Sequence, residues 1–68
     1  QKVDIITLDE GLTELAQLSE RQAQIVEMRY FAGMTIDETA AALEVSPRTV
    51  KGDWRLARAW LKRYLDGA

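Results

Sequence analysis

The stretch TIDETAAALEVSPRTVK, residues 35–51, contains the start signals of two successive helices. Thr35 at its start is followed three residues later by Glu38, which is the spacing of a capping box. In this motif the hydroxyl and the carboxylate each accept a backbone N–H that the first turn of a helix leaves unpaired. The stretch therefore predicts a helix over residues 36–43. Its expected inner face holds Ile36, Ala40 and Leu43.

A second helix start follows after only three residues, 44–46. Ser46 is a good N-cap, and Pro47 stands at the first helical position, where its missing N–H costs nothing. Because the turn is too short for a long antiparallel overlap, we expect the two helices to cross steeply as a helix-turn-helix. The second helix is predicted over residues 47–65. Its apolar stripe, at steps of three and four, is Val50, Trp54, Ala57, Leu61 and Leu65.

Two further helices precede this pair. The first is predicted over residues 8–18, where Leu8, Leu12 and Leu15 recur at helical spacing with Leu18 nearby. The second is predicted over residues 20–31, with Ser19 as its N-cap, Gln22 completing a capping box, and Gly33 as the stop signal. Its expected apolar face consists of Ile25, Val26, Met28, Tyr30 and Phe31.

The predicted fold class is therefore all-α. It is a four-helix domain over residues 8–65 with a C-terminal helix-turn-helix and no winged elements. Residues 1–7 are expected to be a lead-in or linker remnant, and residues 66–68 a tail. A chain of 68 residues has room for one domain. Since it begins with Gln1 and not Met, we expect it to be part of a longer protein.

The composition argues against several classes of function. The chain has no cysteine and no histidine, so no disulfide, no thiolate metal site and no histidine base are available. It has no glycine-rich phosphate loop, and its carboxylates are scattered over solvent-facing helix positions. We therefore expect no enzyme, no metal, no cofactor and no small-molecule substrate. No apolar run is long enough to cross a membrane and no signal peptide is visible, which predicts a cytoplasmic protein without a membrane partner.

The charge is strongly polarised along the chain. Residues 46–65 contain six basic residues and one acidic residue, whereas residues 1–45 contain three basic and nine acidic residues. A net charge of −2 therefore conceals a basic helix on an acidic body. A solvated basic helix would be the ordinary interpretation of such a helix on its own.

The basic residues of this helix form one stripe opposite the apolar stripe, at about 100° per residue. A helix with this surface fits the major groove of duplex DNA, and its N-terminal residues reach the base edges. We expect Arg48 and Arg55 to contact guanine, and Lys51 to contact guanine or phosphate. Gly52 either permits a close approach to DNA or is an unselected surface position. The expected phosphate-side residues are Thr35, Thr49, Arg58 and Lys62, the last two lying towards phosphate or solvent.

Several segments together are similar to region 4 of bacterial sigma factors, especially the extracytoplasmic-function group. They are LSERQ (18–22), RYFAGMTIDETA (29–40), VSPRTVK (45–51) and KGDWRLARAWL (51–61). The resemblance implies binding of the promoter element near minus thirty-five and docking on the β-subunit flap of RNA polymerase. For some members it also implies an anti-sigma partner. It assigns DNA reading to Arg48, Thr49, Lys51, Gly52 and Arg55. It assigns polymerase contact to Trp60 and to exposed apolar residues of the first two helices.

The chain departs from the family pattern at two positions. Glu44 stands where the family usually has glycine, at a position that favours left-handed backbone. Asp53 stands where many relatives have a basic residue, and we expect it to form a salt bridge to a body residue such as Arg29. Trp54 is expected in the core, whereas Trp60 lies at its border.

Two alternatives of a different class remain at this point. The output domain of a response regulator also has four helices with a basic recognition helix, although the RYFAG turn fits the sigma pattern better. A protein-interaction module could instead present the basic stripe to an acidic partner.

Overall fold

The computed structural model describes residues 5–67, and these residues are almost entirely helical. The elements are α1 (Ile5–Leu18), α2 (Glu20–Val26), a π-helical turn η1 (Glu27–Phe31), α3 (Ile36–Leu43) and α4 (Pro47–Gly67). No strand occurs within the described residues. The all-α prediction, with four helices and a C-terminal helix-turn-helix, is confirmed.

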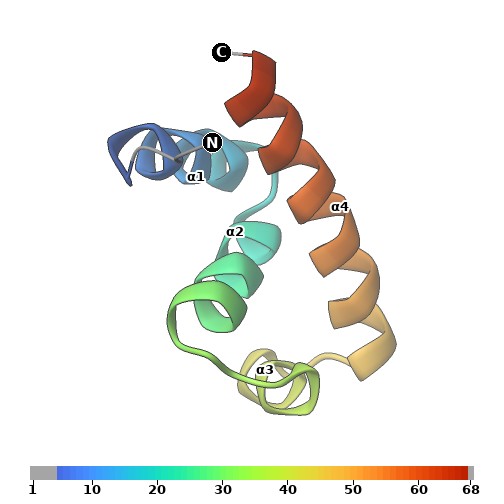
Figure 1. Cartoon of the computed structure of the whole chain (residues 1–68). Helices are drawn as coiled ribbons and strands as arrows, with labels where there is room; N and C mark the ends of the chain where they lie inside the picture. The colour runs from blue at the N-terminus through green and yellow to red at the C-terminus, as the bar shows by residue number, and fades with distance from the viewer. Residues whose placement is uncertain (1–4, 68) are drawn as a thin grey trace.

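Helix α4 runs along one side of the domain and the other helices pack against it at successive levels (Figure 1). α1 lies beside its C-terminal half, α2 beside its middle, and α3 beside its N-terminal end. Only the turn 44–46 joins α3 to α4, and the two helices cross steeply. The basic helix is thus anchored by every other helix of the domain.

The apolar residues form two adjoining clusters. Between α1, α2 and α4 lie Leu12, Leu15, Ala23, Val26, Ala57 and Leu61. Between α2, α3 and α4 lie Ile25, Ala40 and Val50, with Ile25 and Val50 fully buried. Trp54 is half-buried and packs against both clusters, so the expectation that it belongs to the core is confirmed.

The helix ends follow the capping signals with small differences. Thr35 and Glu38 form both hydrogen bonds of the capping box, at 3.0 and 2.8 Å. Ser19 accepts from the backbone N–H of Gln22 at 3.2 Å, but the Gln22 side chain donates to Asp53 instead of completing a box. α1 begins at Ile5, so residues 5–7 of the expected lead-in are helical, while residues 1–4 lie outside the described residues. α4 extends through Gly67, beyond the predicted end at residue 65, and Ala68 lies outside the described residues.

Gly11 is explained by the packing of α1 against α4. A Cβ added there would lie 3.0 Å from Cδ2 of Tyr64 and 3.3 Å from Cδ2 of Leu61. The absence of a side chain therefore allows the two helices to approach closely, at a known cost in helix propensity.

The predicted apolar face of residues 20–31 is wrong at its C-terminal end. Tyr30 and Phe31 are 66% and 58% exposed, and Leu18 at the end of α1 is 68% exposed. The backbone N–H of Ala32 donates to the carbonyl of Glu27 at 3.1 Å, which is the i→i+5 bond of a π-turn. Because such a turn advances by less than 100° per residue, Tyr30 and Phe31 rotate off the face that an ordinary helix would bury.

Candidate nucleic-acid interface

The turn between α3 and α4 sets the direction of the basic helix. Glu44 has φ 59° and ψ 43°, the left-handed conformation that the glycine of the family pattern would adopt without strain. The backbone N–H of Val45 donates to the carbonyl of Ala40 at 3.0 Å and closes the turn. Oγ of Ser46 then accepts the backbone N–H of Thr49 at 3.1 Å, which starts α4. The turn therefore keeps a left-handed residue even though glycine is absent.

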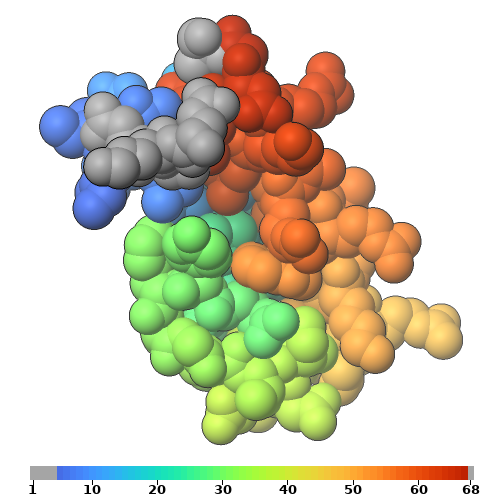
Figure 2. Space-filling view, viewed as in Figure 1, coloured from blue at the N-terminus to red at the C-terminus, as the bar shows by residue number. Residues whose placement is uncertain are grey.

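The first half of α4 presents its basic side to solvent. Arg48, Lys51, Gly52 and Arg55 are all exposed, whereas Val50 on the opposite side is fully buried. A Cβ added at Gly52 would have no atom within 4 Å. Long side chains from this part of α4, drawn in amber and orange, project from the molecule in Figure 2. The structure thus brings these four sequence-predicted residues together on one open surface.

Two predicted phosphate contacts are already engaged in capping. The Thr35 hydroxyl accepts from Glu38 N–H at the start of α3, and its residue is exposed. Thr49 is half-buried, and its hydroxyl lies 2.9 Å from that of Ser46. Both threonines are therefore held in position by the helix starts.

Arg58 and Lys62 lie farther along α4 and in different surroundings from the first four residues. The guanidinium carbon of Arg58 is 5.6 Å from the ring centroid of Trp54. Lys62 Nζ donates to Asp66 at 3.2 Å, one turn along the same helix, and both side chains are well exposed. Arg58 therefore sits over an aromatic ring, and Lys62 has a weak local carboxylate partner.

Asp53 pairs with Arg21, and the predicted pairing with Arg29 is wrong. Nε of Arg21 donates to Asp53 at 2.5 Å, and the Asp53 side chain is only 12% exposed. Arg29 instead donates through Nη1 to the carbonyl of Met34 at 2.7 Å, and its guanidinium lies 5.1 Å from the Trp54 centroid. The sequence reasoning missed Arg21, whose position directly after Glu20 in the first turn of α2 gave no separate signal.

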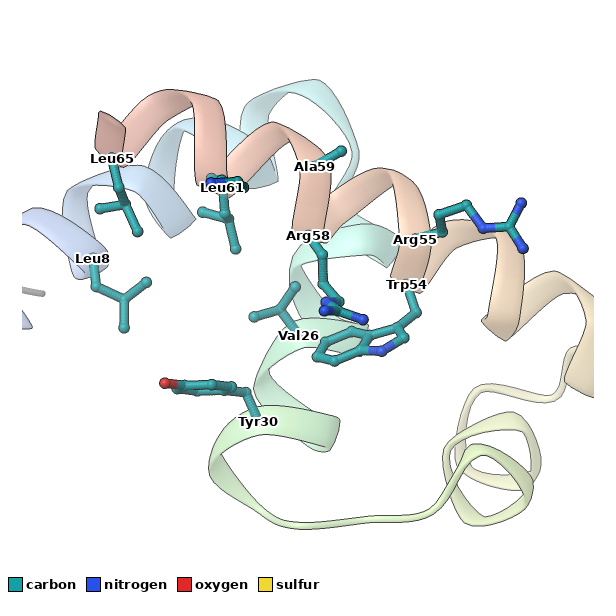
Figure 3. A pocket seen from close by; sticks show the side chains of 10 residues that line it. Leu8, Val26, Tyr30, Trp54, Arg55, Arg58, Ala59, Leu61 and Leu65 are labelled. Carbon is teal, nitrogen blue, oxygen red and sulfur yellow. The ribbon is translucent and has the colours of Figure 1, made fainter. Parts of the chain in front are cut away.

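A groove opens between α1, η1 and α4, next to the basic side of α4. Its volume is about 680 Å³. The space-filling view shows a hollow where these three elements meet (Figure 2). Val26 and Trp54 lie at its centre, with Leu8 and Tyr30 on the side away from α4 (Figure 3). The remaining lining residues all come from α4 and are Arg55, Arg58, Ala59, Leu61, Lys62 and Leu65.

The aromatic residues outside the core form two pairs. Tyr30 and Phe31 make an edge-to-face contact at 5.2 Å beside the groove. Trp60 stacks on Tyr64 at 5.3 Å and packs against the first apolar cluster, which leaves it half-buried. The exposed aromatic surface is therefore supplied by η1 more than by Trp60.

Within residues 5–67 no group of three or more acidic, histidine or cysteine side chains is placed to hold a metal ion. In the same part of the chain, no helix combines the length and the apolar character that crossing a membrane requires.

Taken together, a short left-handed turn, a crossing helix pair and an exposed basic helix face define a helix-turn-helix domain of the DNA-binding class. The sequence model of the ECF sigma factor family matches residues 1–67. The chain therefore belongs to the ECF sigma factor family, whose members direct promoter-specific transcription initiation with RNA polymerase core and are not enzymes. Comparison with curated proteins and with solved structures gave no match.

Proposed function

We propose that this domain recognises the promoter element near minus thirty-five by placing the N-terminal half of α4 in the major groove. The observation that carries the proposal is the joint exposure of Arg48, Lys51, Gly52 and Arg55 on a helix whose other side is buried. These residues span about 10 Å of helix axis, at about 1.5 Å per residue. That length matches the part of a recognition helix that reaches base edges.

In this proposal the residues have different tasks. Arg48 and Arg55 donate to guanine, and Lys51 donates to guanine or phosphate. Gly52 lets the helix backbone approach the bases, which the open space around it supports. Thr35 and Thr49 contact phosphate from the starts of α3 and α4, while Arg58 and Lys62 interact with phosphate farther along.

The test is fluorescence anisotropy of the 68-residue chain against a duplex library at low and near-physiological salt. We expect enrichment of a short motif, and a loss of about 1–3 kcal/mol in binding free energy for Arg48→Ala or Arg55→Ala. Arg63→Ala is the matched control, because Arg63 is an exposed cation near the opposite end of the same helix. Uniform weak binding that disappears with salt, and that all three variants lower equally, would contradict base reading.

We also propose that the groove and the Tyr30–Phe31 pair form the side that docks on the β-flap of RNA polymerase. Apolar side chains from α1 and η1 line or border the groove, and Tyr30 is well exposed there. Tyr30→Ala should weaken binding to purified core polymerase while leaving duplex binding unchanged. Arg48→Ala should do the reverse. If both variants affect both partners equally, the two surfaces are not separate.

Membership of the ECF family favours this proposal over the output domain of a response regulator. An anti-sigma partner remains a prediction from the family resemblance. A protein-interaction module that uses the basic stripe would be indicated if Arg48→Ala and Arg55→Ala left duplex binding unchanged.

A further inference from the structure

Leu56 is an apolar residue on the solvent side of the basic helix. It is 60% exposed, and no other large apolar side chain is exposed along α4 from Pro47 to Gly67. One helical turn from Leu56 on the same side of the helix lie Gly52, which has no side chain, and Trp60, which is half-buried. Because most of its side chain is exposed, Leu56 contributes little to the core of the domain. Arginine and lysine have about the same helix propensity as leucine, so helix formation alone does not require an apolar residue here.

The position of Leu56 places it beside the DNA-reading residues. It follows Gly52 by four residues, which is about 40° around the helix and about 6 Å along its axis. Nothing lies within 4 Å of a Cβ built at Gly52, so the helix surface next to Leu56 is low and open. Arg48 and Arg55 lie on the same exposed half of the helix. A helix held in the major groove by these cations would present Leu56 at the edge of its basic face, about 80° around the helix from Arg48.

We infer that Leu56 recognises the 5-methyl group of a thymine in the major groove, an inference that rests on the proposed function. Among the four bases only thymine presents an apolar group in that groove, while the other edges present donors and acceptors. Seating a leucine against a polar edge would strip that edge of water without replacing its hydrogen bonds. Leu56 thus favours a T·A pair at one position of the bound element and disfavours the alternatives there.

Other exposed apolar residues do not share this placement. Ile5, Ile6 and Leu18 belong to α1, and Tyr30 and Phe31 belong to η1. Single exposed leucines are common on protein surfaces. Leu56 differs because it lies on the helix that the proposal places in the major groove, at the edge of the basic face of that helix.

The test replaces each thymine of the selected duplex by deoxyuridine, one position at a time. This change removes only the methyl group and retains every hydrogen-bonding atom of the base. For the unmodified chain we expect a loss of about fourfold in affinity at one thymine, the effect of one buried methyl-sized group. Leu56→Ala should bind the thymine duplex more weakly by a similar factor and should be insensitive to deoxyuridine at that position, as in a double-mutant cycle.

Leu18→Ala is the matched control, since it removes the same side chain from an exposed site on α1. It should retain the full deoxyuridine effect. Helical circular dichroism should be unchanged in Leu56→Ala, because the residue is exposed and alanine is the best helix former. The inference is overturned if Leu56→Ala keeps the same response to every deoxyuridine as the unmodified chain, or if the selected motif contains no thymine.

Failure of this inference can be distinguished from failure of the proposed function. A selected motif whose binding depends on Arg48 and Arg55, but whose deoxyuridine response is independent of Leu56, overturns the inference alone. The absence of any selected motif overturns both.

Discussion

Arg21 at the start of α2 donates through Nε to the buried carboxylate of Asp53 in the N-terminal half of α4, over a distance of 2.5 Å. Nε2 of the neighbouring Gln22 donates to the other carboxylate oxygen at 3.4 Å. Asp53 is the one acidic residue within the basic segment 46–65, so the pair neutralises it on the side of α4 that faces the body. The contact therefore joins the basic helix to a helix more than thirty residues earlier in the chain.

Asp53→Asn should lower stability without changing sequence preference. The variant leaves Arg21 without its charged partner, but Arg21 is half exposed, so we expect a loss of about 1–2 kcal/mol in the free energy of unfolding. Urea unfolding measures this loss, and the duplex library measures the preference. Asp66→Asn is the control, because it breaks only the exposed pair with Lys62 and should change stability by about 0.5 kcal/mol or less. A changed preference with unchanged unfolding would contradict the structural role of Asp53.

Gly52→Ala should stabilise the domain more than Gly11→Ala. Gly52 lies in an open part of α4, so alanine should raise the free energy of unfolding by about 1 kcal/mol through helix propensity. The same gain at Gly11 is offset, because the new Cβ would lie 3.0 Å from the Tyr64 ring. Thermal unfolding of the two variants tests this difference. Equal stabilisation by both would mean that α1 and α4 can separate at no cost.

Glu44→Gly should stabilise the turn of the helix-turn-helix. Glu44 has a positive φ of 59°, which costs a residue with a side chain about 1 kcal/mol or more. Glycine removes that cost but loses more entropy on folding, which leaves an expected gain of about 0.5 kcal/mol. Urea unfolding of Glu44→Gly and Glu44→Ala tests whether backbone strain is the cause. Alanine retains the left-handed strain, so Glu44→Ala should not raise the free energy of unfolding. A similar gain from alanine would point to the charge of Glu44 instead.

Stability should fall at alkaline pH through Tyr64. Partial burial, and then the nearby carboxylates of Glu14 and Glu10, raise the pKa of its phenol above the ordinary value near 10. The folded state then holds this proton more tightly than the unfolded state. The protonated Tyr64 phenol therefore stabilises the folded state. This stabilisation is fully present below the pKa that Tyr64 has in the unfolded chain, and it is lost as the pH rises through the higher pKa of the folded state.

Tyr64→Phe removes this contribution and should make the urea midpoint less sensitive to pH between about 9 and 11. The comparison with the unmodified chain cancels lysine deprotonation, which both proteins share. Parallel curves for the two proteins over this range would exclude Tyr64 as a source of the alkaline loss.

Local signals in the sequence were sufficient for the four helices and for the exposed basic face of α4. A cap acts over three or four residues, so Thr35, Glu38 and Ser46 define the starts of α3 and α4 without reference to the rest of the chain. The apolar spacing of α4 likewise decides which side is buried, and its basic residues then occupy the opposite side by geometry alone. The family motifs were readable for the same reason, since they are short and lie in a fixed order.

Contacts between residues far apart in the sequence depend on how the helices pack. Arg21 and Arg29 both lie in the helix predicted over residues 20–31, but the packing against α4 brings Arg21 to the carboxylate of Asp53 and Arg29 to Trp54. The π-turn exposes Tyr30 and Phe31 because its hydrogen bonds change the rotation per residue, which an assumed period of 3.6 does not include. The groove between α1, η1 and α4 exists only once three segments are in place. Hydrogen bonding between near neighbours is encoded locally, whereas pairings across the fold depend on the positions that packed helices take.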